Sequence, residues 1–187
     1  MSHLVEGDEG IHDEGHHVFT DRDQISLKLV NNWIYQHKVL RVNYTTYNPR
    51  CAQDSHNPCT HSDIMVLSHN DAHPYWYARI VGIFHAMVMQ TGPKSMSRGS
   101  KKMEFIFVRW FSLDNNEMGG WKTKKLHQIS FVEGDTAFGF IDPADVIHAV
   151  HLIPWFSEGD MKDLLSPSFT WSVLEKDEDW VHYYVNM

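Results

Sequence analysis

Hydrophobic and polar residues alternate along most of the chain beyond position 38, which is the period of a β-strand. Segments rich in β-branched and aromatic residues are separated by clusters of Gly, Pro, Asn and Asp, the residues that form turns. The predicted strands cover residues 39–47, 63–68, 75–89, 103–111, 124–132, 145–153 and 180–186. Seven short strands predict a mainly β fold, and we expect a small, curved SH3-like barrel.

The longest segment, residues 75–89, alternates small and large side chains on one predicted face. That face holds Trp76, Ala78, Ile80, Gly82, Phe84, Ala86 and Val88. Such alternation suits the interior of a small barrel, and Gly82 predicts a bend. The polar, glycine-containing loop that follows predicts an antiparallel hairpin with residues 103–111, which would bring Trp110 close to Trp76.

A helical spacing precedes the strands. Apolar residues recur every fourth position at Ile25, Leu29 and Trp33. Thr20 and Asp23 resemble a capping box, so we predict an α-helix over residues 21–36 that packs Trp33 against the barrel. The alternation that continues through Leu27 leaves a strand as the alternative.

The length and composition fit one domain. The chain has 187 residues, of which 42% are hydrophobic, enough for a single core. Residues 1–19 are rich in Gly, Asp, Glu and His and lack periodicity, which predicts a flexible leader before one domain over residues 20–187 with its barrel core at 62–154. The start lacks the features of a secretory signal, and no apolar run could cross a bilayer, so we expect an intracellular protein without a membrane partner.

The charge balance limits the partners. With 24 acidic and 16 basic residues, the formal net charge is −8, which argues against duplex DNA as the main ligand. A basic partner fits an acidic protein better.

Motifs for catalysis and cofactors are scarce. The string CAQDSHNPCTH supplies Cys51, His56, Cys59 and His61, which are zinc-ligand types, but their spacing differs from that of known zinc fingers. We therefore expect no cofactor, with structural zinc as an alternative. The chain has no glycine-rich phosphate loop, nucleophile elbow or HExxH motif, which predicts a non-catalytic protein and ranks a metal-dependent hydrolase last.

Five of the segments together resemble a bromo-adjacent homology (BAH) domain over residues 62–154. The strings that carry the resemblance are DIMVLS, YWYARIVGIF, FVRWF, KKLHQISFV and DVIHAVHLI, with VRWF after YARI the most specific. Tudor-like and other SH3-like barrels stay open as alternatives. The longer series LRVNYTTYN, THSDIMVLS, HPYWYARIVGIFHA, VRWF, AFGFIDPADVIHAVHLIP and DEDWVHYYVNM also resembles a module of basidiomycete fungal proteins associated with Kyakuja–Dileera–Zisupton DNA transposons.

The BAH resemblance implies a chromatin interaction module, and some members of that family bind methylated lysine of histone tails in an aromatic cage. Trp76 and Trp110 match two cage positions, whereas Ser112 stands where cage-forming members carry another aromatic residue. The remaining wall would then come from Tyr75, Phe111 or Trp121. Ordinary core packing of both tryptophans is the competing interpretation.

These inferences together predict a nuclear, non-catalytic module that binds a basic peptide such as a histone tail. The alternative is a nucleic-acid-binding accessory of a transposase. Its candidate contacts are the basic residues Lys94, Arg98, Lys101, Lys102, Lys122, Lys124 and Lys125.

Overall fold

The described residues are mainly β-strand, which confirms the predicted class. The structure is a computed structural model of residues 1–187, and it describes residues 26–43, 53–68, 74–91, 99–113, 124–157, 159 and 179–186. The strands are β1 (Leu27–His37), β2 (Leu40–Asn43), β3 (Gln53–His56), β4 (Asp63–Leu67), β5 (Tyr75–Gln90), β6 (Lys101–Leu113), β7 (His127–Phe131), β8 (Phe138–Ile141), β9 (Val146–Ala149), β10 (His151–Pro154) and β11 (His182–Asn186). One 3-10 turn, η1 (Pro143–Asp145), lies between β8 and β9.

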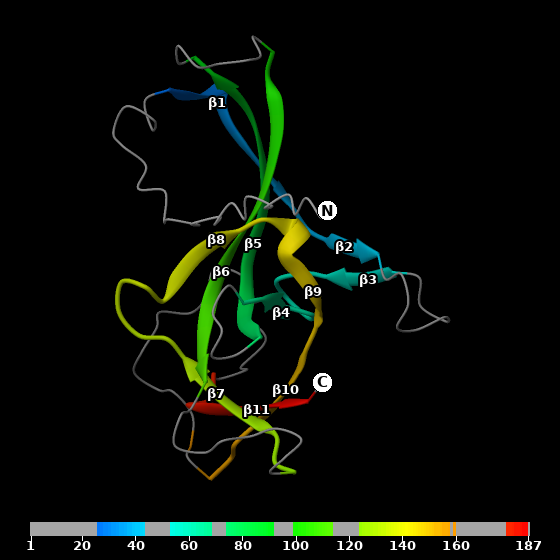
Figure 1. Ribbon diagram of the computed structural model, residues 1–187, viewed down its shortest axis with the longest axis vertical. Helices are drawn as coiled ribbons and strands as arrows, with labels where there is room; N and C mark the ends of the chain where they lie inside the picture. Colours follow the sequence, from blue (N-terminus) through cyan, green and yellow to red (C-terminus); the bar gives the residue numbers. More distant parts are fainter. Residues whose placement is uncertain are drawn as a thin grey trace, which may run out of the picture.

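The long antiparallel pair of β5 and β6 forms the middle of the main sheet (Figure 1). The strand order is β10-β11-β7-β6-β5-β4-β9, with β1 also paired to β5 and β8 to β6. The predicted hairpin pairing is thus confirmed. Strands β2 and β3 form a separate two-stranded sheet.

Besides β1, which falls on the predicted helix, two strands of the structure have no counterpart among the seven predicted segments. These are β3, whose sequence QDSH is polar throughout, and β8, whose sequence FGFI is short and carries a glycine. Neither sequence shows a long apolar alternation, so the period-two pattern could not identify them.

A closed barrel is not found in the described part of the chain, and this expectation is corrected. The hydrogen-bonded path of strands ends at β9 on one side and at β10 on the other. Only Val150 separates these two strands, so one stretch of chain borders both ends of the sheet. Chain continuity, rather than a ladder of hydrogen bonds, brings the ends together.

The predicted helix over residues 21–36 is wrong where the structure describes it, because residues 27–37 form strand β1 on the edge of β5. Residues 21–25 lie outside the described ranges. Asn31 and Asn32 have φ angles of 58° and 54°, and the register shifts there. Asparagine tolerates this left-handed conformation, which produces a bulge. Because of the bulge, the apolar residues of the segment do not keep one regular strand period. Trp33 is 62% exposed rather than buried.

Both faces of the central sheet carry a hydrophobic core. The first core consists of Ile64, Val66, Ala78, Ile80, Ile83, Ile106, Val108 and Val146. The second core consists of Met65, Tyr77, Phe111, Ile129, Phe131, Val150, Tyr183 and Val185. Neighbouring residues in β4 and β5 belong to opposite cores, as strand geometry requires.

A β-bulge in β5 divides the face that the sequence predicted. Ile80 pairs with Val108 and Gly82 with Phe107, so Val81 has no counterpart on β6. One extra residue reverses the faces of all later side chains. Gly82 and Phe84 therefore lie on the face opposite Ile80, and the position at which a bend was predicted, Gly82, adjoins the register shift of this bulge.

Candidate functional site

Trp76 of β5 and Trp110 of β6 meet on the side of the sheet that carries the first core. Trp110 is the cross-strand partner of Ala78, two positions beyond Trp76. The two indole centroids are 5.7 Å apart with an interplanar angle of 80°, an edge-to-face arrangement. Trp76 is 40% exposed, whereas Trp110 is half-buried and packs against the first core. The antiparallel pairing thus brings the two residues together as expected.

The backbone on both sides of Trp110 is tied to the connection between β7 and β8. Its N–H donates to the carbonyl of Ala137 at 2.8 Å, and its carbonyl accepts from the N–H of Val132 at 3.0 Å. Gly139 of β8 approaches the indole closely, because a Cβ added there would lie 2.6 Å from Nε1 of Trp110. A glycine is needed at this position to leave room for the ring.

Two exposed carboxylates occupy the same connection. Glu133 and Asp135 lie between Val132 and Ala137, the residues that hydrogen-bond to Trp110. The connection that hydrogen-bonds to Trp110 therefore carries negative charge, and Glu133 acts electrostatically on Arg109, whose guanidinium lies over Phe131 of the second core. A cation is attracted both to the face of an indole and to carboxylates.

Tyr75 and Phe111 do not join the tryptophans. Phe111 is buried in the second core, on the opposite face, and Tyr75 packs against that core. Successive residues of a strand point to opposite faces, which separates each from its tryptophan neighbour. Ser112 is exposed, and Trp121 lies outside the described residues. Within the described ranges, two of the proposed aromatic residues form a common site.

Sequence reasoning missed a network of charged side chains next to the second core. Nε of Arg79 donates to Oδ1 of Asp63 at 2.7 Å, and Nη1 of Arg79 donates to Asp179. The guanidinium also lies 5.1 Å from the ring centroid of Phe131. Burial acts to lower the pKa of Arg79, but the charge and hydrogen bonds of Asp63 lead the opposing effects and raise it above the ordinary arginine value. This network joins the C-terminal segment to β4 and β5.

The described members of the predicted Cys/His set do not gather around one point. His56 is fully buried, while Cys59 and His61 are exposed, and Cys51 lies outside the described residues. Among the residues that the structure describes, no group of three or more His, Cys, Asp or Glu side chains could hold a metal ion. Burial lowers the pKa of His56, although the carboxylate of Asp54, 3.3 Å away, opposes this.

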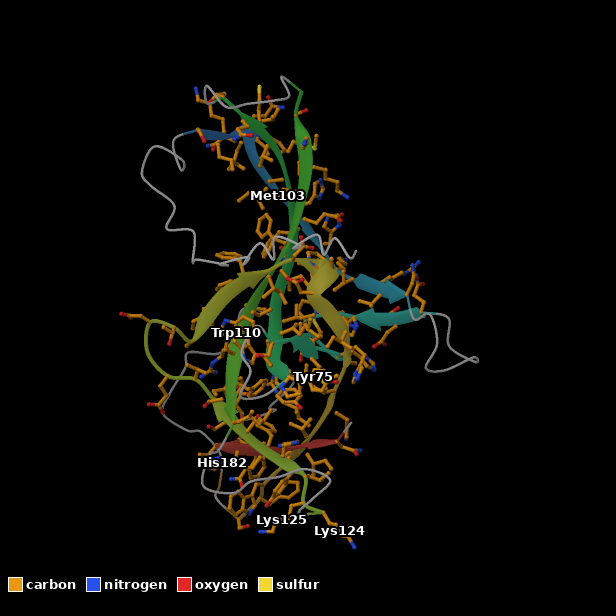
Figure 2. All side chains as sticks on the ribbon, viewed as in Figure 1. Tyr75, Met103, Trp110, Lys124, Lys125 and His182 are labelled. Atoms are coloured by element: carbon orange, nitrogen blue, oxygen red, sulfur yellow. The ribbon has the colours of Figure 1, made fainter. Side chains whose placement is uncertain are left out.

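The basic residues of the nucleic-acid alternative are separated in the structure. Lys101 and Lys102 begin β6 next to Met103, whereas Lys124 and Lys125 lie at the far end of the molecule (Figure 2). Lys102 is paired with Glu104 at 2.5 Å. The other three residues, Lys94, Arg98 and Lys122, lie outside the described ranges. The four described lysines therefore do not make one continuous basic surface.

In the part of the chain that the structure describes, no helix has the length and apolar character needed to span a membrane. No protein-family model matches this chain, and neither the curated proteins nor the solved structures compared with it give a match.

Proposed function

We propose that this chain is a non-catalytic interaction module in which Trp76 and Trp110 receive a cationic side chain of a basic peptide. The observation that carries the proposal is the edge-to-face pair of indoles with Trp76 partly exposed. A methylated lysine of a histone tail is the ligand that this chemistry suits best. We accordingly expect a nuclear protein.

The physical basis is the attraction between a cation and an aromatic face. In this edge-to-face pair the planes of the two indoles are 80° apart, and an alkylammonium group would contact an exposed indole face, since a cation is attracted to ring faces and not to ring edges. Methylated ammonium costs less to desolvate than a bare ammonium, because it forms fewer hydrogen bonds with water. Contacts of this kind contribute about 0.5–2 kcal/mol each, depending on exposure.

The charge of the protein supports the same class of ligand. The formal net charge is −8, and Glu133 and Asp135 are exposed in the turn that holds Trp110. Asp142, the N-cap of the 3-10 turn that follows β8, and Asp145, the last residue of that turn, are also exposed. Such charges speed the encounter with a basic peptide and disfavour acidic partners.

The order of strands supports a BAH-like interpretation of the fold. Strands β4, β5, β6 and β7 are successive neighbours, and β9 returns to the outer edge of β4. A small barrel interrupted at Val150 would have this order, with β9 and β10 as two halves of its closing strand. The association with chromatin and with transposon-related proteins belongs to this proposal.

The test is binding of Trp76→Ala to a panel of modified and unmodified histone-tail peptides. Trp76 is the residue to change, because Trp110 also packs against the core and its loss would affect folding. We expect the variant to lose about 1–2 kcal/mol of peptide affinity, roughly five- to thirtyfold in Kd. Trp76→Phe should recover part of it, since a smaller aromatic face remains.

Trp33→Ala provides the matched control. Trp33 is a more exposed tryptophan on β1, so its removal should leave both folding and peptide affinity unchanged. Thermal melts of all three variants would show that the differences arise in the folded state. A peptide panel that gives no binding, or equal affinities for the parent and Trp76→Ala, would refute the proposal. Salt-dependent binding to an oligonucleotide that requires Lys124 and Lys125 would favour the alternative.

A further inference from the structure

A pair of histidines lies on the part of the sheet formed by β1 and β5, away from the tryptophans. Nε2 of His37 and Nδ1 of His85 are 2.5 Å apart, and the ring centroids are 4.7 Å apart at an interplanar angle of 29°. Tyr35, the cross-strand partner of His85, stacks on the same imidazole at 4.7 Å and 10°. His37 and His85 are 48 positions apart in the chain, and the pairing of β1 with β5 brings them together.

The facing nitrogens lie within hydrogen-bonding distance of each other. At this distance one imidazole must donate an N–H and the other must accept it with its lone pair. The hydrogen bond therefore places one basic nitrogen of each histidine next to the other. Imidazole nitrogen is a preferred ligand of divalent transition metals, which compete with protons for the same lone pairs. A metal ion that replaces the hydrogen-bonded proton would be bound by both rings.

Binding of one metal ion by both rings requires the rings to turn, because the two nitrogens face each other directly. Two nitrogens about 2.0 Å from one metal ion and at neighbouring corners of a tetragonal or octahedral shell are roughly 2.8 Å apart. Tetrahedral coordination needs a wider separation of roughly 3.3 Å. The observed 2.5 Å is closer to the first value. Both histidines are only half-buried, so their rings have room to turn slightly and water can complete the coordination.

A carboxylate lies beside the pair. Glu104 of β6 is the cross-strand partner of His85, and its pKa is lowered by the hydrogen bond with Lys102 and, to a smaller extent, by the two histidines. Its charge would partly neutralise a bound cation, while Lys102 opposes this. The pKa of His85 is lowered by partial desolvation and then by Lys102 and His37.

We propose that His37 and His85 form a two-histidine binding site for a divalent transition metal ion of the nickel and copper type. The described residues supply no third protein ligand to complete such a site, so water molecules fill the other positions of the metal. A metal bound there would clamp β1 to β5 on the C-terminal side of the bulge at Asn31 and Asn32, where residues 34–37 pair with residues 83–86.

The test is calorimetric titration with Ni²⁺ at pH 7.5. The chain contains 14 histidines, so the background protein should carry His3→Gln, His12→Gln, His16→Gln and His17→Gln, which remove the histidines of the predicted leader. In this background we expect one Ni²⁺ site that His85→Gln and His37→Gln each weaken at least about tenfold. His151→Gln, which removes an exposed histidine of β10, should leave the affinity unchanged.

A second readout separates binding from folding. The Ni²⁺ ion is paramagnetic, so the imidazole proton signals of His37 and His85 should broaden before those of other histidines. Thermal melts without metal should be similar for the background and the His85→Gln variant, since the ring is half-buried. If both histidine variants bind Ni²⁺ as tightly as the background, or if His151→Gln weakens binding equally, the site does not exist as proposed.

Discussion

Arg79 is the residue whose replacement tests most directly how the C-terminal segment is attached to the sheet. Its guanidinium contacts two carboxylates, Asp63 through Nε at 2.7 Å and Nη2 at 3.3 Å, and Asp179 through Nη1. It also lies 5.1–5.6 Å from the ring centroids of Phe111, Phe131 and Tyr183. The three charged side chains are largely buried.

The variant Arg79→Met retains apolar contact with these rings but removes the positive charge. Asp63 and Asp179 are then left with much less compensation, because Arg109 is only at the edge of ion-pairing range, 3.9 Å from Asp179. Breaking a buried ion pair by removing one partner costs about 3–5 kcal/mol. That is a large part of the 5–15 kcal/mol by which a typical domain is stable, so the variant should be close to unfolding at 37 °C.

Urea unfolding followed by tryptophan fluorescence would measure this loss. Lys102→Met is the matched control, because it breaks an exposed pair with Glu104 and should change the free energy of unfolding by less than about 1 kcal/mol. If Arg79→Met unfolds at the same urea concentration as the parent, the network contributes no net stability. The reasoning about the buried charges would then be incorrect.

Two further predictions concern close packing and pH. Gly139→Ala would place a Cβ 2.6 Å from Nε1 of Trp110, so it should destabilise the protein by about 1–3 kcal/mol and weaken peptide binding. Gly82→Ala would place a Cβ 2.5 Å from the ring of Phe84, on the face opposite the tryptophans. A thermal melt should therefore show a similar loss of stability, while calorimetry should show unchanged peptide affinity. Equal effects of the two variants on peptide affinity would contradict the site. Burial lowers the pKa of His56 from the ordinary value of 6.5. The unfolded chain therefore binds a proton at His56 more readily than the folded chain does. The stability that neutral His56 supplies is complete above pH 6.5 and should be lost as the pH falls through the folded-state pKa. Urea unfolding at several pH values should show this fall in the parent and a shallower one in His56→Leu, and equal slopes would show that His56 does not titrate as inferred.

The mainly β class and the central hairpin could be predicted from the sequence because both depend on local patterns. Alternation with a period of two is visible in residues 75–89 and 103–111, and the polar loop between them specifies an antiparallel pair. The meeting of Trp76 and Trp110 followed from that pairing alone. Trp76 lies near the start of the first strand and Trp110 near the end of the second, and in an antiparallel hairpin these two ends lie side by side.

Segment 27–37 shows where local pattern was insufficient. Its apolar residues have a helical spacing, but the edge of β5 was available for pairing, and two asparagines in the left-handed conformation insert a bulge. Tertiary pairing therefore outweighed the local preference. The bulge before Gly82 likewise moved Phe84 to the other face, because a single additional residue reverses the alternation.

The sequence by itself determined the mainly β class, most of the strand segments, and that two tryptophans would meet across a hairpin. Only the tertiary structure decided that Arg79 reaches Asp179 and that His37 meets His85. Contacts between residues 48 or 100 positions apart depend on strand order and register, which a period-two pattern does not specify. The chemistry of the surface is therefore set by pairings that no local segment of the chain encodes.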